Sequence, residues 1–225
     1  MIMKRKKRTL IPAFTLLELV FVIVILGILV ALAIPRMNRD LRQEAADNIL
    51  SAIRYTQHLA LTDNKHRFDT SDWLQRLWLI RFESYDGNII FKIGSDMDQE
   101  GNIDKEESAI DPLTKKYLFT TDATEDSDES RTVFLTKYYD ITDVTFNDCH
   151  GELDSDAKHI AFDNLGRPHR GILDTSGSGG ADNTYNTYID NKQCEITFTS
   201  DSFNDIKIII LPETGYAYID GQEDS

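Results

Sequence analysis

The stretch Ala13-Phe14-Thr15-Leu16-Leu17-Glu18 decides the fold expected for this chain of 225 residues. It follows the basic run Lys4-Arg5-Lys6-Lys7-Arg8 and opens an apolar segment that continues to Pro35. Glu18 is the only ionisable side chain between this basic run and Arg36. A charge at membrane depth costs at least about 2.5 kcal/mol on insertion scales. We therefore expect Glu18 to have a specific role.

The apolar segment has the length of a membrane-spanning helix. Residues 14–34 can form an α-helix of about 30 Å, which crosses the hydrocarbon core of a bilayer. The preceding positive charges predict a cytoplasmic N-terminus and export of the chain after Pro35. The end of the segment, Ile34-Pro35-Arg36-Met37, has no small-residue site for cleavage of a secretory signal. We therefore expect the helix to be retained as a membrane anchor, with the rest of the chain exported.

These N-terminal residues resemble those of type IV pilins and type II secretion pseudopilins. The shared features are a basic leader, a cleavage point before Phe14, Glu18 as the fifth mature residue, and Gly27 and Pro35 in the apolar helix. The resemblance implies that a prepilin peptidase cuts after Ala13 and methylates the new amino terminus. Ala13 departs from the family, which prefers Gly there. The resemblance also implies other pilin or pseudopilin subunits as partners, in a periplasmic pseudopilus or a cell-surface pilus.

Glu18 has a physical role in such a filament. In a bundle of parallel helices its carboxylate can meet the ammonium group of Phe14 on a neighbouring subunit, which neutralises both charges in an apolar core. This pairing would set the axial stagger of the subunits. One alternative is a simple anchor with Glu18 near the membrane interface. Another is a membrane-anchored binding module that does not polymerise.

The rest of the chain predicts an α+β fold, in which a long N-terminal helix packs on a head of mainly antiparallel β-sheet. Apolar residues recur at helical spacing after Pro35, and we expect the helix to reach about Leu61, unbroken or divided at Pro35. These residues are Met37, Leu41, Ala45, Ile49, Ala52, Tyr55 and Leu59. The expected organisation is a leader over 1–13, a transmembrane or filament-core helix over 14–35, its amphipathic continuation over 36–63, and one head domain over 64–225.

The charge of the chain limits its partners. Loss of the leader would leave 19 basic against 38 acidic residues, because the leader holds five of the 24 basic residues and none of the acidic ones. Such a surface argues against nucleic acid, since phosphate binding depends on clustered Lys and Arg. It favours cations and basic protein surfaces.

The head contains short runs with the composition of strands. The expected strands are 77–83, 88–93, 117–120, 132–136, 143–146, 159–162, 195–199, 207–211 and 216–219. Ser84-Tyr85-Asp86-Gly87 would connect the first two as a hairpin. Trp73 and Trp78 are expected in the aromatic core or at the seam with the helix. Two segments are expected to be loops, the acidic 122–130 and the Gly/Ser-rich 174–183.

The C-terminal part carries a second resemblance. The segment Ile160-Ala161-Phe162-Asp163-Asn164-Leu165-Gly166-Arg167-Pro168, with the strands after it and the turn Pro212-Glu213-Thr214-Gly215, resembles the ending of the GspH/FimT group of minor pseudopilins and pilins. The resemblance implies that Gly166 and Gly215 serve tight turns. The two strands after these glycines would close the sheet of the head.

One segment of the head predicts a metal site. Asp96-Met97-Asp98-Gln99-Glu100-Gly101-Asn102-Ile103-Asp104-Lys105-Glu106-Glu107 matches the calcium loop of an EF-hand position by position. The expected ligands are Asp96, Asp98, Glu100, the backbone carbonyl of Asn102, Asp104 and bidentate Glu107. Hard oxygen ligands in a flexible loop select Ca²⁺, here with a structural role, whereas the alternative is a solvated acidic loop. Because a strand precedes the segment, we expect a lone calcium loop between strands.

Few other residues indicate a covalent bond or a reaction. Cys149 and Cys194 are the only cysteines, and an oxidising periplasm favours a disulfide between them over a free pair. His150, His159 and His169 lie near aspartates in sequence, but no Ser or Cys nucleophile has an elbow-like context. We expect these histidines at the surface or in turns, and we expect no enzymatic activity.

Overall fold

The computed structural model describes residues 16–67, 69, 72–149, 158–170, 172, 188–189 and 192–223, without the side chains of 31–40 and 72. The predicted processing residues Ala13 and Phe14 lie outside this range. The contacts divide the chain into one unit up to Asp40 and a second unit, the head, from Leu41 onward. The described residues form an α+β fold with antiparallel sheets and an N-terminal helix, as predicted from the sequence.

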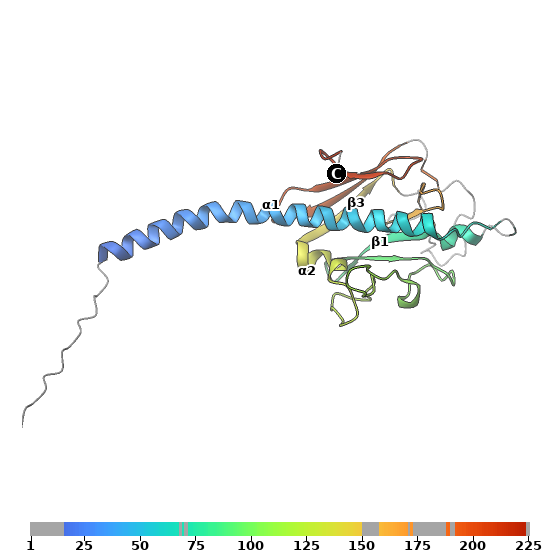
Figure 1. Ribbon diagram of the computed structural model, residues 1–225, viewed down its shortest axis with the longest axis horizontal. Helices are drawn as coiled ribbons and strands as arrows, with labels where there is room; N and C mark the ends of the chain where they lie inside the picture. The colour runs from blue at the N-terminus through green and yellow to red at the C-terminus, as the bar shows by residue number, and fades with distance from the viewer. Residues whose placement is uncertain are drawn as a thin grey trace, which may run out of the picture. The chain divides into compact units, whose positions relative to one another are not determined.

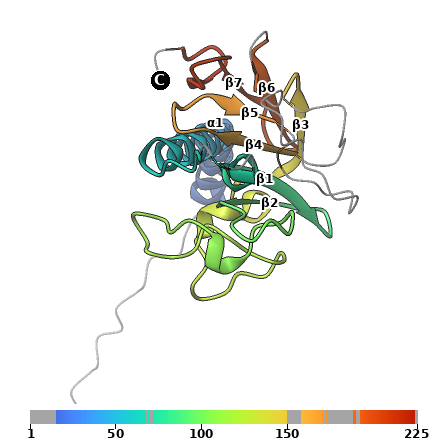
Figure 2. The same ribbon diagram turned by 90° about the vertical axis from the view of Figure 1, so that its right-hand side faces the viewer.

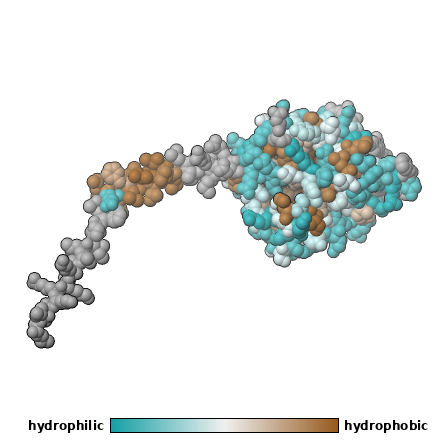
Figure 3. All heavy atoms as spheres, in the orientation of Figure 1, coloured by the Kyte–Doolittle hydropathy of each residue, from teal (hydrophilic) through white to brown (hydrophobic). Residues whose placement is uncertain are grey.

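The N-terminal helix α1 runs from Leu16 to Thr62 as one element (Figure 1). The apolar side chains between Leu16 and Val30 are exposed, and this part of the surface is the brown section of helix in Figure 3. In the described part of the chain, no helix combines the length and the apolar character needed to cross a membrane.

The second half of α1 belongs to the head and packs one face into its core. Ala45, Ile49 and Ala52 are buried, while Leu41 and Tyr55 are partly buried against the core, which confirms the predicted apolar face. The helix ends within about one residue of the predicted position. Polar side chains on this half of α1 bond to the carbonyl oxygens of loops and strand ends, and these contacts fix the helix on the sheets.

The first antiparallel sheet has the strand order β2-β1-β4-β5 among the described residues (Figure 2). Its strands are β1 (Trp78–Tyr85), β2 (Asn88–Gly94), β4 (Lys158–Phe162) and β5 (Pro168–His169). β1 and β2 form the predicted hairpin, but the turn is only Asp86-Gly87, since Tyr85 pairs with Asn88. Positive φ angles of 50° and 79° at the two turn residues match the tight turn that suits the twist of a hairpin.

The second antiparallel sheet has the order β3-β6-β7-β8 among the described residues. Its strands are β3 (Ile141–Asn147), β6 (Cys194–Ser200), β7 (Ile206–Ile210) and β8 (Ala217–Ile219). The strands after Gly166 and Gly215 are the edge strands β5 and β8, so they close two different sheets and not the single predicted one. At Gly215, with φ of +66°, a Cβ atom would lie 2.2 Å from the Gly166 carbonyl oxygen, so only glycine fits.

Two predicted strands are absent from the described residues, and both fall between β2 and β3. Phe134 forms only an isolated bridge with Ile90, and the other residues of 132–136 belong to a 3-10 helix, Arg131–Val133, or to the short helix α2, Leu135–Tyr139. The hydroxyl of Thr136 accepts from the Ile89 N–H and donates to the Ile141 carbonyl, which fixes the helical turn between two strands. Residues 117–120 form only isolated bridges through Tyr117.

The sheets and α1 share one hydrophobic core. Phe82 of β1 contacts the rings of Phe91 on β2, Phe146 on β3 and Phe198 on β6, at centroid distances of 6.2, 6.0 and 5.2 Å. This cluster joins the two sheets.

A second, smaller core contains Leu79 and Ala161, which are paired across β1 and β4. Its other buried members are Trp73, Leu74, Leu77, Ile103, Phe119 and Ile172. Trp73 is therefore buried as expected, but in the second core and not in the one that holds the phenylalanine cluster. Trp78 lies near the seam with α1, because its Nε1 donates at 2.9 Å to Asp63, the residue that follows the end of the helix.

Candidate metal centre

The predicted calcium loop forms a closed excursion between β2 and the chain that returns beside it. Gly94 and Ser108 form an isolated bridge at its base, and the Ala109 N–H donates to the Ile93 carbonyl at 2.8 Å. A strand therefore precedes the loop, as expected, and Glu107 ends a short 3-10 helix, Lys105–Glu107. The loop is held at both ends by backbone hydrogen bonds.

Asp96, the first predicted ligand, organises the first half of the loop. Its side chain is buried and accepts hydrogen bonds from the backbone N–H groups of Gln99 at 2.6 Å and Gly101 at 2.9 Å. Gly101 has a φ of +83°, a conformation that glycine adopts without strain and that turns the chain within the loop. The first half of the loop thus curls around one carboxylate.

Glu107, the last predicted ligand, points back into the loop from its other end. Its Oε1 accepts from the N–H groups of Met97 at 2.6 Å and Asp98 at 3.1 Å, and its Oε2 accepts from Asp104 at 3.2 Å. Both oxygens of this carboxylate therefore face the interior of the loop. An inward-facing, two-oxygen carboxylate is what the twelfth position of a calcium loop requires.

The carboxylate oxygens form two overlapping groups. Oxygens of Asp96, Asp98 and Glu107 lie within 4.8 Å of one another, and so do those of Asp98, Glu100 and Asp104. A Ca²⁺ ion binds oxygens at about 2.3–2.6 Å, so a single ion can bridge oxygens with this separation. The five carboxylates predicted as ligands thus lie in two groups of three that share Asp98, and their all-oxygen chemistry fits a hard cation. The backbone carbonyl of Asn102 stays a prediction.

The electrostatics of this loop favour a positive charge. Burial raises the pKa of Asp96 to about 6, and the Glu107 carboxylate adds to the shift against the hydrogen bonds from Gly101 and Gln99. This raised pKa means that the surroundings disfavour the negatively charged form of Asp96. A bound cation would relieve that cost.

Side chains beyond the predicted ligands tie the loop to the head. Ile103 is buried in the second core, and Arg81 of β1 donates to the Gly101 carbonyl at 3.3 Å. Lys105 pairs with Asp128 of the acidic loop at 2.6 Å. The contacts of Arg81 and Asp128 with this loop were not predicted, because contacts between distant segments leave no local pattern.

The other predicted site residues lie apart from this loop in the sequence. Glu18 is in the first turn of α1 and is exposed. Cys149 and Cys194 form a disulfide across a sequence separation of 45 residues, which confirms the predicted pairing.

A buried charged cluster around Asp163 was not predicted. Asp163 and His169 are fully buried, and His159 is almost so, which makes the prediction of surface or turn positions for these two histidines wrong. The cause is the pairing of β4 with β1 and β5, which covers both residues. His150 lies outside the described residues. Asp163 pairs with Arg167 at 2.6 Å and approaches His169 Nε2 at 3.4 Å.

These contacts make Asp163 a stabilising carboxylate. Burial alone would raise the pKa of Asp163, but hydrogen bonds from His169 and from the N–H groups of Arg167 and Leu165 hold the pKa below its usual range. Because the folded pKa lies below the unfolded value, the stabilisation is complete above an unfolded pKa of about 3.9. It is lost as the pH falls through the folded value.

We predict that Asp163→Asn lowers the free energy of unfolding at pH 7 by about 2 kcal/mol, because charged hydrogen bonds are lost. The difference from the wild type should shrink as the pH falls below about 4. Urea unfolding at pH 7 and pH 3 measures both effects. Asp143→Asn is the matched control, since its ion pair with Lys158 is at the surface and contributes at most about 1 kcal/mol. Equal losses in the two variants would contradict the prediction.

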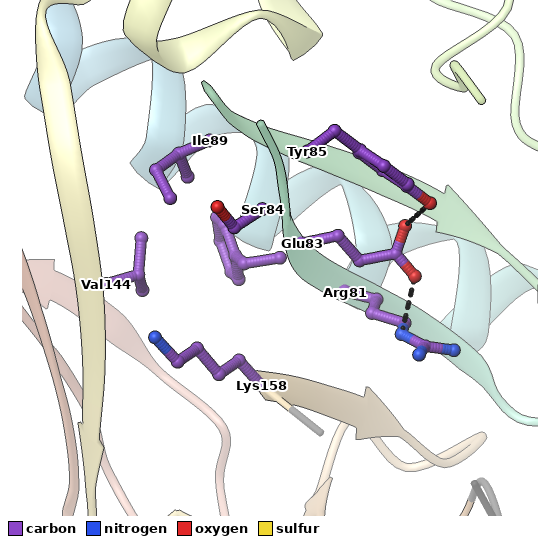
Figure 4. A pocket seen from close by; sticks show the side chains of 8 residues that line it. Arg81, Glu83, Ser84, Tyr85, Ile89, Val144 and Lys158 are labelled. Atoms are coloured by element: carbon purple, nitrogen blue, oxygen red, sulfur yellow. Dashed lines mark hydrogen bonds and ion pairs between the residues drawn. The ribbon is translucent and has the colours of Figure 1, made fainter. Parts of the chain in front are cut away.

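A separate hollow of about 330 Å³ lies beside the β1–β2 hairpin (Figure 4). Its lining residues are Arg81, Phe82, Glu83, Ser84, Tyr85, Ile89, Val144 and Lys158. Glu83 accepts from the Tyr85 hydroxyl at 2.7 Å and pairs with Arg81 at 2.8 Å, so these polar groups bind one another. None of the predicted metal ligands lines this hollow, so the two features are distinct.

Comparison of the chain with models of protein families, with curated proteins and with solved structures finds no match.

Proposed function

We propose that the chain is a structural subunit, a minor pseudopilin or pilin, of a type II secretion or type IV pilus-like filament. The observation that carries this proposal is the division of α1 into two parts with different surfaces. The first part exposes apolar side chains from Leu16 to Val30, and the second packs into an antiparallel head. A surface of this kind is unfavourable in water, so it needs a bilayer or other apolar helices around it.

In this proposal the head is exported and the apolar part of α1 first lies in the inner membrane, then in the core of the filament. The disulfide supports export, because disulfides persist in oxidising compartments. The prepilin peptidase would act at Ala13 and Phe14. Glu18 in the first described turn of α1 would then pair with the new amino terminus of a neighbouring subunit.

We predict that the mature protein begins at Phe14. The intact mass of protein extracted from membranes should show the loss of residues 1–13, with one methyl group added to the new terminus. Ala13→Gly, which restores the residue that the family prefers, should be processed at least as fast. An Ala13→Leu variant is the matched control, because a large side chain before the cut should slow processing. A mature chain that begins after Pro35 would contradict the filament proposal.

We also propose that the loop of residues 96–107 binds one Ca²⁺ ion with a structural role. The inward carboxylates of Asp96 and Glu107 support this proposal, together with the grouping of Asp98, Glu100 and Asp104. The ion would neutralise part of the negative charge of the loop. Ile103 of the same loop is buried in the second core, so an ordered loop would also support that core. Its expected effect is to stabilise the head.

We predict that Ca²⁺ raises the melting temperature of the full-length protein in detergent by several degrees. Binding to the folded state adds about 2.7 kcal/mol when the free ion is a hundredfold above Kd. Glu107→Ala should remove this response. Glu106→Ala is the matched control, because Glu106 is an exposed acid of the same 3-10 helix and is not a predicted ligand. Identical melting curves of the wild type in calcium and in chelator would make the loop an acidic turn only.

The alternative function is a membrane-anchored, calcium-dependent binding module that never polymerises. The acidic loop favours it as much as it favours the filament subunit. The two proposals differ at the N-terminus, because only the filament subunit needs a free amino group near Glu18. The mass measurement at Phe14 therefore separates them.

A further inference from the structure

A short loop beside α1 holds one leucine almost completely in solvent. Leu113 is 91% exposed, more than any other large hydrophobic residue among those described in the head. The loop is rigid at this point, because the buried Asp111 carboxylate accepts from the N–H of Leu113 at 2.9 Å and from the Thr114 hydroxyl at 2.7 Å. Ser130 also donates to this carboxylate at 2.8 Å. The leucine is therefore presented outward by a fixed scaffold.

An apolar groove lies next to this leucine. It has a volume of about 180 Å³, and its lining includes Ala52 and Tyr55 of α1 together with Pro112, Leu113 and Leu118, so Leu113 also borders its own groove. The Tyr55 hydroxyl donates to the Ile110 carbonyl at 2.9 Å, so the rim is held in place. An apolar cavity of roughly 150 Å³ accepts a benzene-sized group. The groove therefore has room for one aliphatic side chain.

The two sides of this patch carry opposite charges. On the loop side Lys115 is exposed two residues after Leu113. On the helix side Glu44 and Asp47 are exposed, one turn before the groove residues Asn48 and Ser51. Residues four apart on a helix share a face, so these acids border the groove. The projecting Leu113 thus has a basic residue next to it, and the groove has acidic residues along its border.

We propose that this patch is a contact between two copies of the chain. Leu113 of each copy enters the groove of the other, and Lys115 of each copy faces Asp47 and Glu44 of the other. A two-fold axis brings the same patch of both subunits together, so a patch with both a projection and a matching groove is self-complementary. Two copies of the chain repel each other because each has a formal charge of −14. At this patch, the attraction of Lys115 to the acids of the other copy offsets that repulsion. The inference does not depend on the assembly role proposed for Glu18.

Cysteine cross-linking in the full-length protein tests the contact. One tagged chain carries Leu113→Cys and a second, differently tagged chain carries Ser51→Cys. Both positions are exposed, and the native cysteines are already paired in a disulfide, so each variant should fold and offer one free thiol. Mild oxidation should join the two chains. The matched control pairs Ser51→Cys with Leu165→Cys, a leucine that is 63% exposed on a different turn.

Charge reversal provides the second arm of the test. Lys115→Glu or Asp47→Lys alone should lower the cross-linking yield about tenfold, because like charges then face each other across the contact. The two reversals together should restore the yield. The cross-link should also form in a Glu18→Leu background, which separates this contact from the proposed helix assembly.

Three results would overturn the proposal. The first is a Leu113–Ser51 yield no higher than that of the Leu165 control. The second is failure of the double charge reversal to restore cross-linking. The third is cross-linking of the Leu113→Cys chain only to a different protein, which would assign the groove to that protein and not to a second copy.

Discussion

Replacing Glu18 by Leu should leave the chain in the membrane but prevent its co-assembly with partner pilins. Insertion should improve, because a buried charge that costs at least about 2.5 kcal/mol is removed. Assembly should fail, because the ammonium group of a neighbouring Phe14 would be left in the apolar core without its partner. Breaking a buried pair costs about 3 kcal/mol or more, which lowers each association constant by roughly a hundredfold.

Membrane fractionation and filament pull-down measure the two effects of Glu18→Leu separately. Glu18→Asp is the matched control, because it keeps the carboxylate and shortens the side chain by one methylene. We expect this variant to assemble better than Glu18→Leu and less well than the wild type. Normal filament assembly by Glu18→Leu would refute the pairing role of Glu18, whether or not residues 96–107 bind Ca²⁺.

Removing the disulfide between Cys149 and Cys194 should lower the free energy of unfolding of the head by about 4 kcal/mol. The bond closes a loop with a sequence separation of 45 residues, and the entropy of the unfolded chain rises when that loop is opened. For a domain of this size the melting temperature should fall by roughly 10 °C. The double variant Cys149→Ala with Cys194→Ala, compared with the wild type in urea, measures the loss.

Chemical reduction of the wild type is the control for this variant. Both cysteines are buried, so the alanine substitutions also remove packing, and reduction isolates the effect of the bond. Reduced wild type should lose most of the stability that the double variant loses. A reduced protein as stable as the oxidised one would contradict the loop-closure account.

Local sequence patterns were sufficient for much of the architecture. The helical spacing of Ala45, Ile49 and Ala52 predicts the buried face of α1, because a helix repeats its faces every 3.6 residues. The β1–β2 hairpin follows in the same way from two strand-like runs around Asp86-Gly87. The motif at 96–107 predicted which carboxylates lie near one another, since these residues all belong to one short loop.

Other features could not be derived from local patterns. Residues 132–136 have strand-like composition but form helical turns, because Thr136 bonds to the strand residues Ile89 and Ile141. The burial of His159 and His169 depends on strand pairing across β4, which neither residue indicates by itself. The groove beside Leu113 exists only because a distant loop lies against α1.

The sequence by itself determined the long helix with a single carboxylate in its apolar part, the hairpin, the acidic loop and the choice of the two cysteines as partners. Each of these depends on residues close together in the chain, or on a pair with no competing partner. Only the tertiary structure decided the division into two sheets, the second core under Ile103, the buried Asp163 cluster and the patch around Leu113. These features come from contacts between segments far apart in the chain, where burial and pairing outweigh local preference.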